Sequence, residues 1–180
     1  MNRNKFSQTL FKEEQRFRQW WLLVIVFATS ALPWIGFFYQ IVLGNKFGNN
    51  PAPDILIIII WILFGIGFPL LFLSARLVTE IREDGIYIKF FPFHFNYKFF
   101  AFEEIESFEE REYRPIYEYG GWGIRYGFGG IAYNVSGNKG VQLIMKNKKK
   151  ILIGSQKSHE FYKAIKKLKS DRINNSSHQF

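Results

Sequence analysis

The sequence predicts an α-helical membrane hairpin followed by a mainly β domain that ends in one amphipathic helix. Two observations predict this fold class. Residues 20–43 and 55–75 are long apolar runs without a charged side chain. After residue 76, apolar and polar residues alternate, which is typical of antiparallel strands. We therefore interpret the 180-residue chain as two segments of different chemistry.

The two apolar runs are long enough to cross a bilayer. At 1.5 Å per residue, residues 20–43 reach about 36 Å and residues 55–75 about 31 Å, whereas a hydrocarbon core is roughly 30 Å thick. Residues 44–54 form a short connection rich in Gly, Asn and Pro. A cleaved signal peptide is the alternative for the first run, but the apolar sequence continues well beyond the length typical of a signal peptide. We therefore expect a two-helix hairpin over residues 20–75.

The basic residues beside the hairpin predict its orientation. Those outside the two runs are Lys12, Arg16, Arg18, Arg76 and Arg82, whereas the connection holds only Lys46. Because positively charged flanks stay in the cytoplasm, both termini are expected there. The protein is then a multi-pass protein of the inner or plasma membrane of the cell, and residues 1–19 are a basic cytoplasmic segment.

Residues 76–169 are expected to form the β domain. Six or seven short strands are predicted, at residues 76–83, 86–91, 95–102, 102–113, 131–137, 141–146 and 150–154. The spacing of Ile105 and Phe108 implies a bulge or a bend. A helix over residues 158–169 has its apolar side chains on one face. Residues 170–180 are polar and are expected to be a disordered tail.

Three stretches of the β domain carry a family resemblance: LVTEIREDGIYIKF, YKFFAFEEIESFEEREY and GVQLIMKNKKKILIGSQKSHEFYKAI. They resemble the pleckstrin-homology-like (PH-like) domains of small bacterial membrane proteins of uncharacterised function. The resemblance implies a bent antiparallel sheet or partly open barrel with one C-terminal helix, and no known activity. The chain departs from lipid-binding relatives, because Glu80, Glu83 and Asp84 stand where those relatives place basic residues that hold inositol phosphates.

The residue content argues against an enzyme. The chain has no cysteine, which excludes a disulfide scaffold, a thiolate metal site and a cysteine nucleophile. Its three histidines lack ligand spacing, so neither a metal nor a cofactor is expected. Gly127, Gly129 and Ala132 fit a dinucleotide-binding pattern, but no strand-to-helix turn is expected there. The six carboxylates of residues 103–112 are interpreted as a hydrated acidic face, and no catalytic residue is predicted.

The Gly-rich segment 119–130 is the first candidate binding site. It is predicted to be a mobile loop, and loops are frequent recognition sites. Trp122, Arg125 and Tyr126 offer a large contact area and a fixed cation to a partner protein or ligand. The alternative interpretation is that Trp122 folds back over the edge of the sheet.

The second candidate site is a basic turn, formed by Lys146, Lys148, Lys149 and Lys150. Residues 139–180 hold eleven basic and two acidic residues. A tethered domain could place this face on anionic lipid headgroups, although a solvated basic face is the alternative. Nucleic acid is not an expected partner, because aromatic residues are not interleaved with the lysines.

These patterns favour a non-enzymatic, membrane-anchored PH-like module that contacts a partner protein or anionic lipid headgroups at the cytoplasmic membrane surface. The alternative hypothesis is an accessory or assembly subunit of a larger membrane complex or transporter. In that case the helices are the working surface, and Gly36, Gly65 and Gly67 permit close helix contacts.

Overall fold

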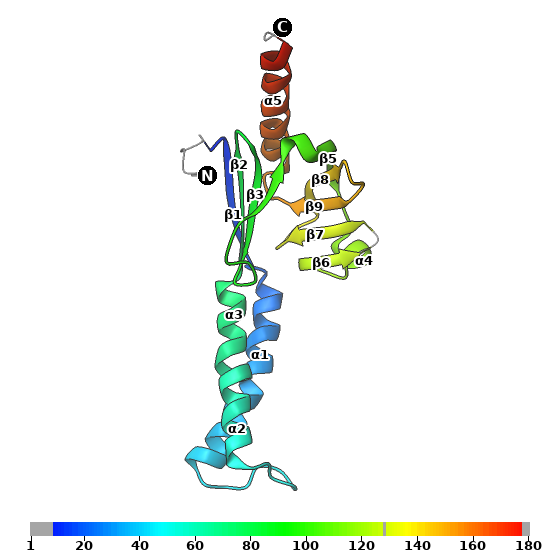
Figure 1. Cartoon of the computed structure of the whole chain (residues 1–180). Helices are drawn as coiled ribbons and strands as arrows, with labels where there is room; N and C mark the ends of the chain where they lie inside the picture. The colour runs from blue at the N-terminus through cyan, green and yellow to red at the C-terminus, as the bar shows by residue number, and fades with distance from the viewer. Residues whose placement is uncertain (1–8, 128, 178–180) are drawn as a thin grey trace. The chain divides into compact units, whose positions relative to one another are not determined.

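The computed structural model of the chain describes residues 9–127 and 129–177 (Figure 1). The chain divides into two compact units. One is a helical hairpin of residues 17–75. The other, the β domain, combines the segment before residue 17 with the segment after residue 75.

The hairpin consists of two apolar helical stretches. The first is α1 (Trp20–Phe37), which continues as the π-helical segment η1 (Phe38–Val42). The second consists of α2 (Asp54–Ile60), the π-helical segment η2 (Trp61–Gly67) and α3 (Phe68–Ser74). The two stretches match the predicted runs to within a residue at each end. By length and composition, both could cross a membrane.

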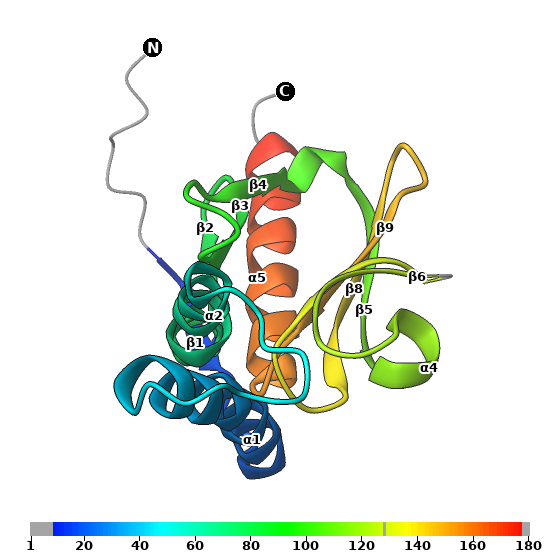
Figure 2. The same cartoon turned by 90° about the horizontal axis from the view of Figure 1, so that it is seen from below.

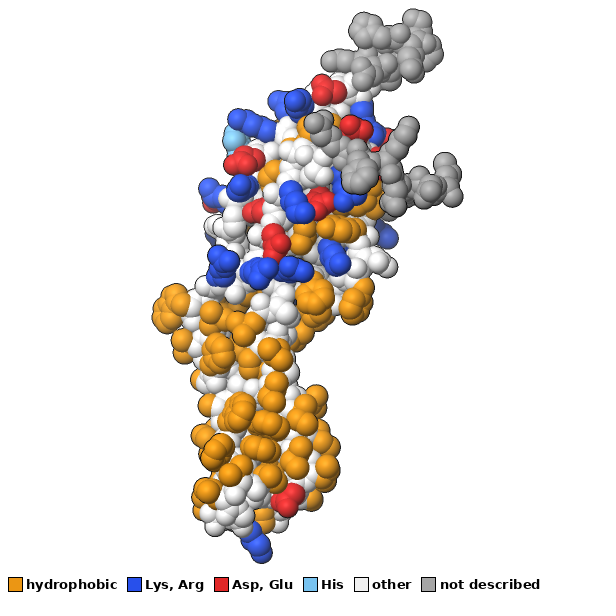
Figure 3. All heavy atoms as spheres, turned by 90° about the vertical axis from the view of Figure 1, so that its left-hand side faces the viewer, with side chains coloured by type: hydrophobic (Ala, Val, Ile, Leu, Met, Phe, Trp, Pro, Cys, Tyr) orange, Lys and Arg blue, Asp and Glu red, His pale blue; other side chains and the backbone are white. Residues whose placement is uncertain are grey.

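Aromatic side chains and a glycine hold the two helical stretches together. The Trp34 indole Nε1 donates a hydrogen bond to the Gly65 carbonyl at 3.1 Å. The Trp61 ring lies edge-on to Trp34 at 5.1 Å and stacks on Phe37 at 4.0 Å between centroids. A Cβ on Gly65 would lie 2.9 Å from the Trp61 ring of the same stretch and 3.4 Å from Trp34 Nε1 of the other stretch, so a glycine suits this position. Elsewhere most hairpin side chains are exposed and hydrophobic, as Figure 3 shows on one face.

The β domain contains a four-stranded antiparallel sheet in the order β1-β2-β3-β4. Its strands are β1 (Phe11–Arg16), β2 (Arg76–Arg82), β3 (Gly85–Phe91) and β4 (Lys98–Ala101). Strands β2, β3 and β4 were expected from the alternating pattern. Strand β1 was not: part of the predicted basic segment 1–19 pairs with β2 as an edge strand.

A five-stranded sheet forms the other half of the domain, in the order β5-β8-β9-β7-β6. Its strands are β5 (Ile105–Glu112), β8 (Lys139–Met145), β9 (Lys150–Gly154), β7 (Gly130–Asn134) and β6 (Gly123–Gly127). All pairs are antiparallel except β7 with β9. The shift in pairing between Ile105 and Ser107 confirms the predicted bulge. Two short helices, η3 (Phe102–Glu104) and α4 (Pro115–Tyr119), flank β5.

The C-terminal helix α5 (Ser158–Ser177) lies between the two sheets (Figure 2). Phe161 stacks on Phe11 of β1, with ring centroids 5.3 Å apart, and Tyr162 packs against Phe108 of β5 at the same distance. Ile165 is fully buried. The helix continues to Ser177, beyond its predicted end at residue 169 and into the predicted tail. Residues 178–180 of that tail lie outside the described residues.

Candidate interaction surface

Residues 119–127 of the Gly-rich segment form the end of α4 and the edge strand β6, where a mobile loop was expected. Gly120, in the left-handed region with φ of 71°, ends α4, and residues 123–127 form the edge strand β6. A Cβ on Gly127 would overlap the Glu118 carbonyl oxygen. The glycines therefore allow α4 to pack directly on β6, a role that the sequence pattern did not reveal.

The three residues predicted to form a site here differ in their contacts and exposure. Trp122 donates a hydrogen bond from Nε1 to the Gly137 carbonyl at 2.9 Å, which places its ring against the β7–β8 turn. Arg125 donates from Nε to the Trp122 carbonyl at 2.9 Å and is exposed. Tyr126 is 74% exposed. This position of Trp122 agrees with the interpretation that its side chain folds back over the edge of the sheet.

An exposed apolar surface follows α4 and β6. Ile116 and Tyr117 of α4 are 71% and 82% exposed, close to the value for Tyr126 on β6. A Cβ on Gly127 would meet the Glu118 carbonyl, so α4 packs on the face of β6 that carries Gly127 and Arg125. Side chains alternate along a strand, so Tyr126 projects from the opposite face of β6. We call Ile116, Tyr117, Arg125 and Tyr126 the aromatic edge. Sequence analysis missed Ile116 and Tyr117, although RPIYEY is an apolar group within a charged stretch.

Buried aromatic and polar groups fix α4 beneath the aromatic edge. Tyr113, Tyr119, Ala132 and Leu152 form a buried cluster between α4 and the five-stranded sheet. Burial raises the pKa of Tyr113 to about 12, although its hydroxyl accepts a hydrogen bond from the Asn134 amide at 3.1 Å. A rigid base of this kind holds the exposed side chains above it in a fixed position.

Arg111 extends this base on the outer face of the sheet. Its guanidinium forms an ion pair with Glu118 at 2.8 Å and donates a hydrogen bond to the Gln142 side-chain oxygen at 3.0 Å. It lines a shallow cleft of about 230 Å³ together with Lys150. Glu118 and Gln142 already bind the Arg111 guanidinium. We therefore assign Arg111 a structural role and do not propose a ligand site in this cleft.

The four predicted lysines lie together on the β8–β9 turn. Lys148 adopts a φ of 65° and pairs with Glu106 at 2.7 Å, while Lys146, Lys149 and Lys150 are exposed. The backbone amide of Lys146 donates to the Glu104 carbonyl at 2.8 Å. The basic turn therefore lies beside η3.

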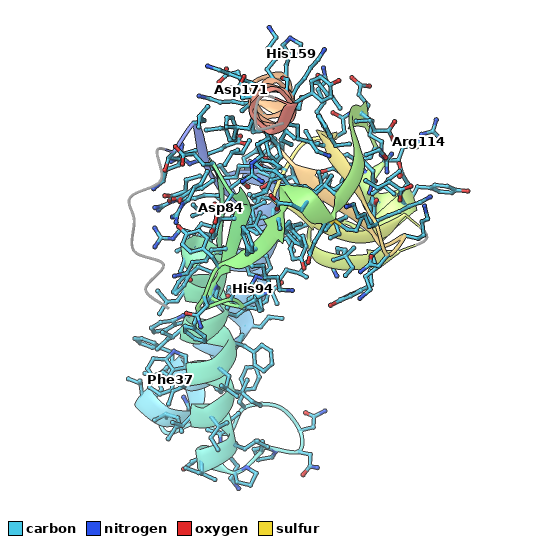
Figure 4. All side chains as sticks on the ribbon, turned by 45° about the horizontal axis from the view of Figure 1, so that its top comes forward. Phe37, Asp84, His94, Arg114, His159 and Asp171 are labelled. Carbon is cyan, nitrogen blue, oxygen red and sulfur yellow. The ribbon has the colours of Figure 1, made fainter. Side chains whose placement is uncertain are left out.

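Two ends of the four-stranded sheet can be defined. The turn end carries the β2–β3 turn, where the Phe102 amide donates to the Asp84 carbonyl at 3.4 Å, so η3 and the basic turn lie there. The connection end carries Arg16, Arg76 and Phe91, which are paired side by side. At that end β1 leads into the first helical stretch, and the second helical stretch leads into β2. Seven residues of β2 separate the two ends by roughly 20 Å. Figure 4 marks Asp84 at the turn end and His94 beyond the connection end.

A charged cluster occupies the outer face of the same sheet. Glu80 is almost fully buried and contacts Lys12 at 3.0 Å, Arg82 at 2.6 Å and the Tyr97 hydroxyl at 3.2 Å. Burial raises the pKa of Glu80, but hydrogen bonds from Arg82 and Lys12 outweigh burial, so the pKa lies below its ordinary value. Glu80 is therefore an ionised, fully engaged carboxylate, unsuited to accept a proton at neutral pH.

Within residues 9–127 and 129–177, no three His, Cys, Asp or Glu side chains are grouped closely enough to hold a metal ion. His94 lies against the Tyr133 ring, with centroids 5.9 Å apart. His159 contacts Glu110 at 3.0 Å on the surface of α5. His178 is outside the described residues.

A comparison with protein families gives a match over most of the chain. No curated protein and no solved structure matches the chain significantly. A family model described as a family of unknown function, DUF6141, matches residues 1–170. That range covers both the hairpin and the β domain. The chain therefore belongs to the DUF6141 family.

Proposed function

We propose that the protein is a membrane-anchored, non-enzymatic binding module that holds a partner protein at the cytoplasmic surface of the cell membrane. The hairpin crosses the bilayer, and the β domain carries the binding surface. Two helices of sufficient length and apolar character support the anchoring half of the proposal. Exposed apolar surface on the β domain supports the binding half.

Strand pairing supports a topology with both flanks of the hairpin on one side. Strand β1 precedes the first helix and β2 follows the second, yet the two strands pair along their whole length, from Phe11 with Ile81 to Arg16 with Arg76. Paired strands cannot lie on opposite sides of a bilayer. The basic residues at these flanks favour the cytoplasm as that side.

We also infer that the β domain is PH-like. In favour are its two sheets and the single C-terminal helix, whose buried face includes Phe161 and Ile165. The parallel pairing of β7 with β9 departs from the purely antiparallel sheet that the resemblance implies. So does β1, which comes from before the hairpin.

The observation that carries the binding proposal is the aromatic edge. Large apolar side chains that stay exposed on both sides of a fixed edge strand are typical of protein interfaces, and Tyr and Arg are enriched among the residues that contribute most to binding. Among the strands that the structure describes, β6 is also the edge of its sheet, where an extended segment could add as a further strand. We expect a partner segment with apolar side chains and an acidic group opposite Arg125.

Site-specific photocrosslinking of the full-length protein in its native cells tests this proposal. A photoreactive residue at position 117 or 126 should give the same protein adduct from both positions. The matched control is position 163, an exposed lysine on α5. The substitution Arg125→Glu should reduce the adduct several-fold, since it reverses the charge that faces the partner.

Two results would contradict the proposal. Equal adducts from position 163 would mean that the aromatic edge is not the contact surface. Lipid adducts from position 149, without protein adducts from 117 or 126, would instead favour contact of the basic turn with anionic headgroups.

The accessory-subunit hypothesis has one specific observation in its favour. A groove of about 600 Å³ runs between the two helical stretches and is lined mainly by apolar side chains, including Ala31, Ile66 and Leu70. A further transmembrane helix could pack there. The glycines favour this hypothesis less, since Gly36 and Gly65 are already buried inside the hairpin, whereas Gly67 is exposed.

Filling the groove separates the two hypotheses. Ala31→Phe blocks the groove, whereas the matched substitution Ala28→Phe adds the same bulk on the exposed face outside it. Selective loss of a co-purifying membrane protein in Ala31→Phe would support the accessory-subunit hypothesis. Unchanged co-purification in both variants would contradict it.

A further inference from the structure

The loop between β3 and β4, residues 92–97, exposes two phenyl rings from a fixed base. Phe93 and Phe95 are 59% and 78% exposed. The Phe93 ring packs against Phe90 of the core at 6.0 Å between centroids, and the Tyr97 hydroxyl donates to Glu80 at 3.2 Å. Both sides of the loop are thus anchored, and its phenyl groups remain outside the core.

Exposure of this kind is unfavourable in water. A phenylalanine side chain gains free energy when it leaves water, and this loop places two of them within three residues. Clustered exposed apolar side chains mark a surface that another phase or molecule covers.

Strand register and chain connectivity place this loop at the connection end. Phe91, the last residue of β3, pairs with Arg76, the first residue of β2. Only Ala75 separates Arg76 from the end of α3 at Ser74. Two residues span at most about 7 Å, and paired strands lie about 5 Å apart. The β3–β4 loop, which carries the exposed phenyl groups, therefore starts about 5 Å from Arg76, and Arg76 lies two residues after the end of the second apolar helix.

The charges at the connection end match the headgroup region of a bilayer. The Arg76 guanidinium lies 5.6 Å from the centre of the Phe91 ring, and both Arg16 and Arg76 contact Glu14 with their side chains partly exposed. Arginine at headgroup level with aromatic rings beside it is the arrangement found at membrane interfaces.

We propose that the β3–β4 loop inserts Phe93 and Phe95 into the interfacial region of the bilayer beside the end of the second helix. This inference rests on the proposed membrane anchoring. Because the hairpin already holds the loop at the membrane, insertion is an intramolecular step, so even a weak gain per phenyl group favours it. The loop then supplies a contact with the membrane additional to the two chain connections and restricts tilting of the β domain.

Fluorescent labels at single cysteines in the full-length protein, reconstituted in lipid vesicles, test the proposal. The chain has no native cysteine, so each label is unique. Phe95→Cys labelled with an environment-sensitive dye should be quenched by lipids that carry a spin label near the headgroup, and protected from aqueous iodide. Lys149→Cys, at the turn end, should show the opposite behaviour. Leu63→Cys lies near the middle of the second span and, tested with lipids that carry the spin label on the acyl chain, reports on insertion of the hairpin itself.

Three outcomes would overturn the proposal, and they differ from one another. If the label at position 95 is quenched by iodide while the label at position 63 is quenched by lipid, the protein is anchored in the membrane but the loop does not insert. Protection from both quenchers at position 95 means that protein, not lipid, covers the loop. Absence of lipid quenching at position 63 contradicts membrane anchoring and with it loop insertion.

A substitution pair provides an independent measurement. With the label at Asn96→Cys, the double substitution Phe93→Ser and Phe95→Ser should abolish lipid quenching. The matched control Phe47→Ser removes an exposed ring from the 44–54 connection and should leave that quenching unchanged. Equal quenching in all three proteins would show that the two phenyl groups do not insert.

Discussion

Two buried polar residues of the β domain, Glu80 and Tyr113, are held by specific partners. Glu80 has two cations and a phenol around it, and Tyr113 has the Asn134 amide. An unpaired polar group in the same positions would cost the free energy of its desolvation. These residues therefore link stability to particular contacts and, for Glu80, to pH.

Glu80→Gln should make the β domain less stable at neutral pH and its stability less dependent on pH. The folded pKa of Glu80 is lowered, so its stabilisation is present above the unfolded value of about 4.3 and is lost as pH falls through the folded pKa. At pH 7 we expect a loss of about 1–3 kcal/mol, because Arg82 and Lys12 lose their counter-charge. Thermal unfolding in detergent from pH 7 to pH 3, followed by circular dichroism, measures both effects; parallel curves for the two proteins would contradict this prediction.

Tyr113→Phe should destabilise the β domain by about 1–3 kcal/mol, because the buried Asn134 amide loses its acceptor. The Tyr113 pKa of about 12 gives a second test, since burial disfavours the phenolate. In absorbance titrations, wild type minus Tyr113→Phe should show no phenolate formation near pH 10. A difference curve with an ordinary tyrosine midpoint would show that Tyr113 is not buried as described.

Among the elements, β1 is the one whose role differs most from expectation. Its inward side chains bind the turn between β9 and α5. Glu13 accepts hydrogen bonds from the Ser155 hydroxyl at 2.6 Å and from the Gln156 backbone N–H at 2.9 Å. Gln15 donates to the Gly154 carbonyl at 2.8 Å. The strand thus connects the four-stranded sheet to the start of α5.

Glu13→Ala and Glu14→Ala should have different effects although the residues are adjacent. Glu13 is buried, and its loss leaves two donors without an acceptor, which should cost about 1–3 kcal/mol. Glu14 forms only exposed ion pairs with Arg16 and Arg76, so its loss should cost about 0–1 kcal/mol. Chemical denaturation in detergent compares the two variants. Equal destabilisation would mean that β1 does not hold the β9–α5 turn.

At the scale of the whole molecule, the pairing of β1 with β2 ties the two ends of the hairpin to one domain. Both the strand pairing and the charges that flank the helices therefore bear on the proposal that the two flanks of the hairpin lie on the same side of the membrane. Reversing one helix alone would separate β1 from β2 and remove an edge strand. The strand pairing is therefore consistent with the proposed membrane topology.

Single cysteines in intact cells test this topology. Glu14→Cys and Lys149→Cys should both resist a membrane-impermeant thiol reagent applied from outside, whereas Asn49→Cys in the connection should react with it. All three positions are exposed, so protection would reflect the membrane rather than burial within the protein. Reaction at position 14 without reaction at position 149 would contradict the shared side of the two strands.

The predictions from sequence succeeded where one chemical pattern repeats over many residues. The two apolar runs are helices, and alternation correctly gives the buried faces of β3, β8 and β9, including Ile88, Leu143 and Ile153. The bulge after Ile105 also follows from spacing alone. In each case the signal lies within the element itself, because solvent exposure alternates along a strand.

The missed elements lack such a signal. Strand β1 buries Phe11, Glu13 and Gln15. Because two of these three inward residues are polar, the sequence shows no alternation of apolar and polar residues there. Strand β6 contains two glycines in five residues and reads as a loop. The predicted binding residues also diverge: the lysines share one turn, but Trp122 lies against the β7–β8 turn, apart from exposed Tyr126.

The sequence alone determined the two apolar helices, their charged flanks and most of the strands, because hydrophobic free energy depends on local composition and period. The tertiary structure decided which side chains remain exposed at the aromatic edge and in the β3–β4 loop. It also decided that residues 11–16 and 76–82 share a sheet. These features depend on partners distant in the chain, such as the Ser155 hydroxyl that hydrogen-bonds to buried Glu13.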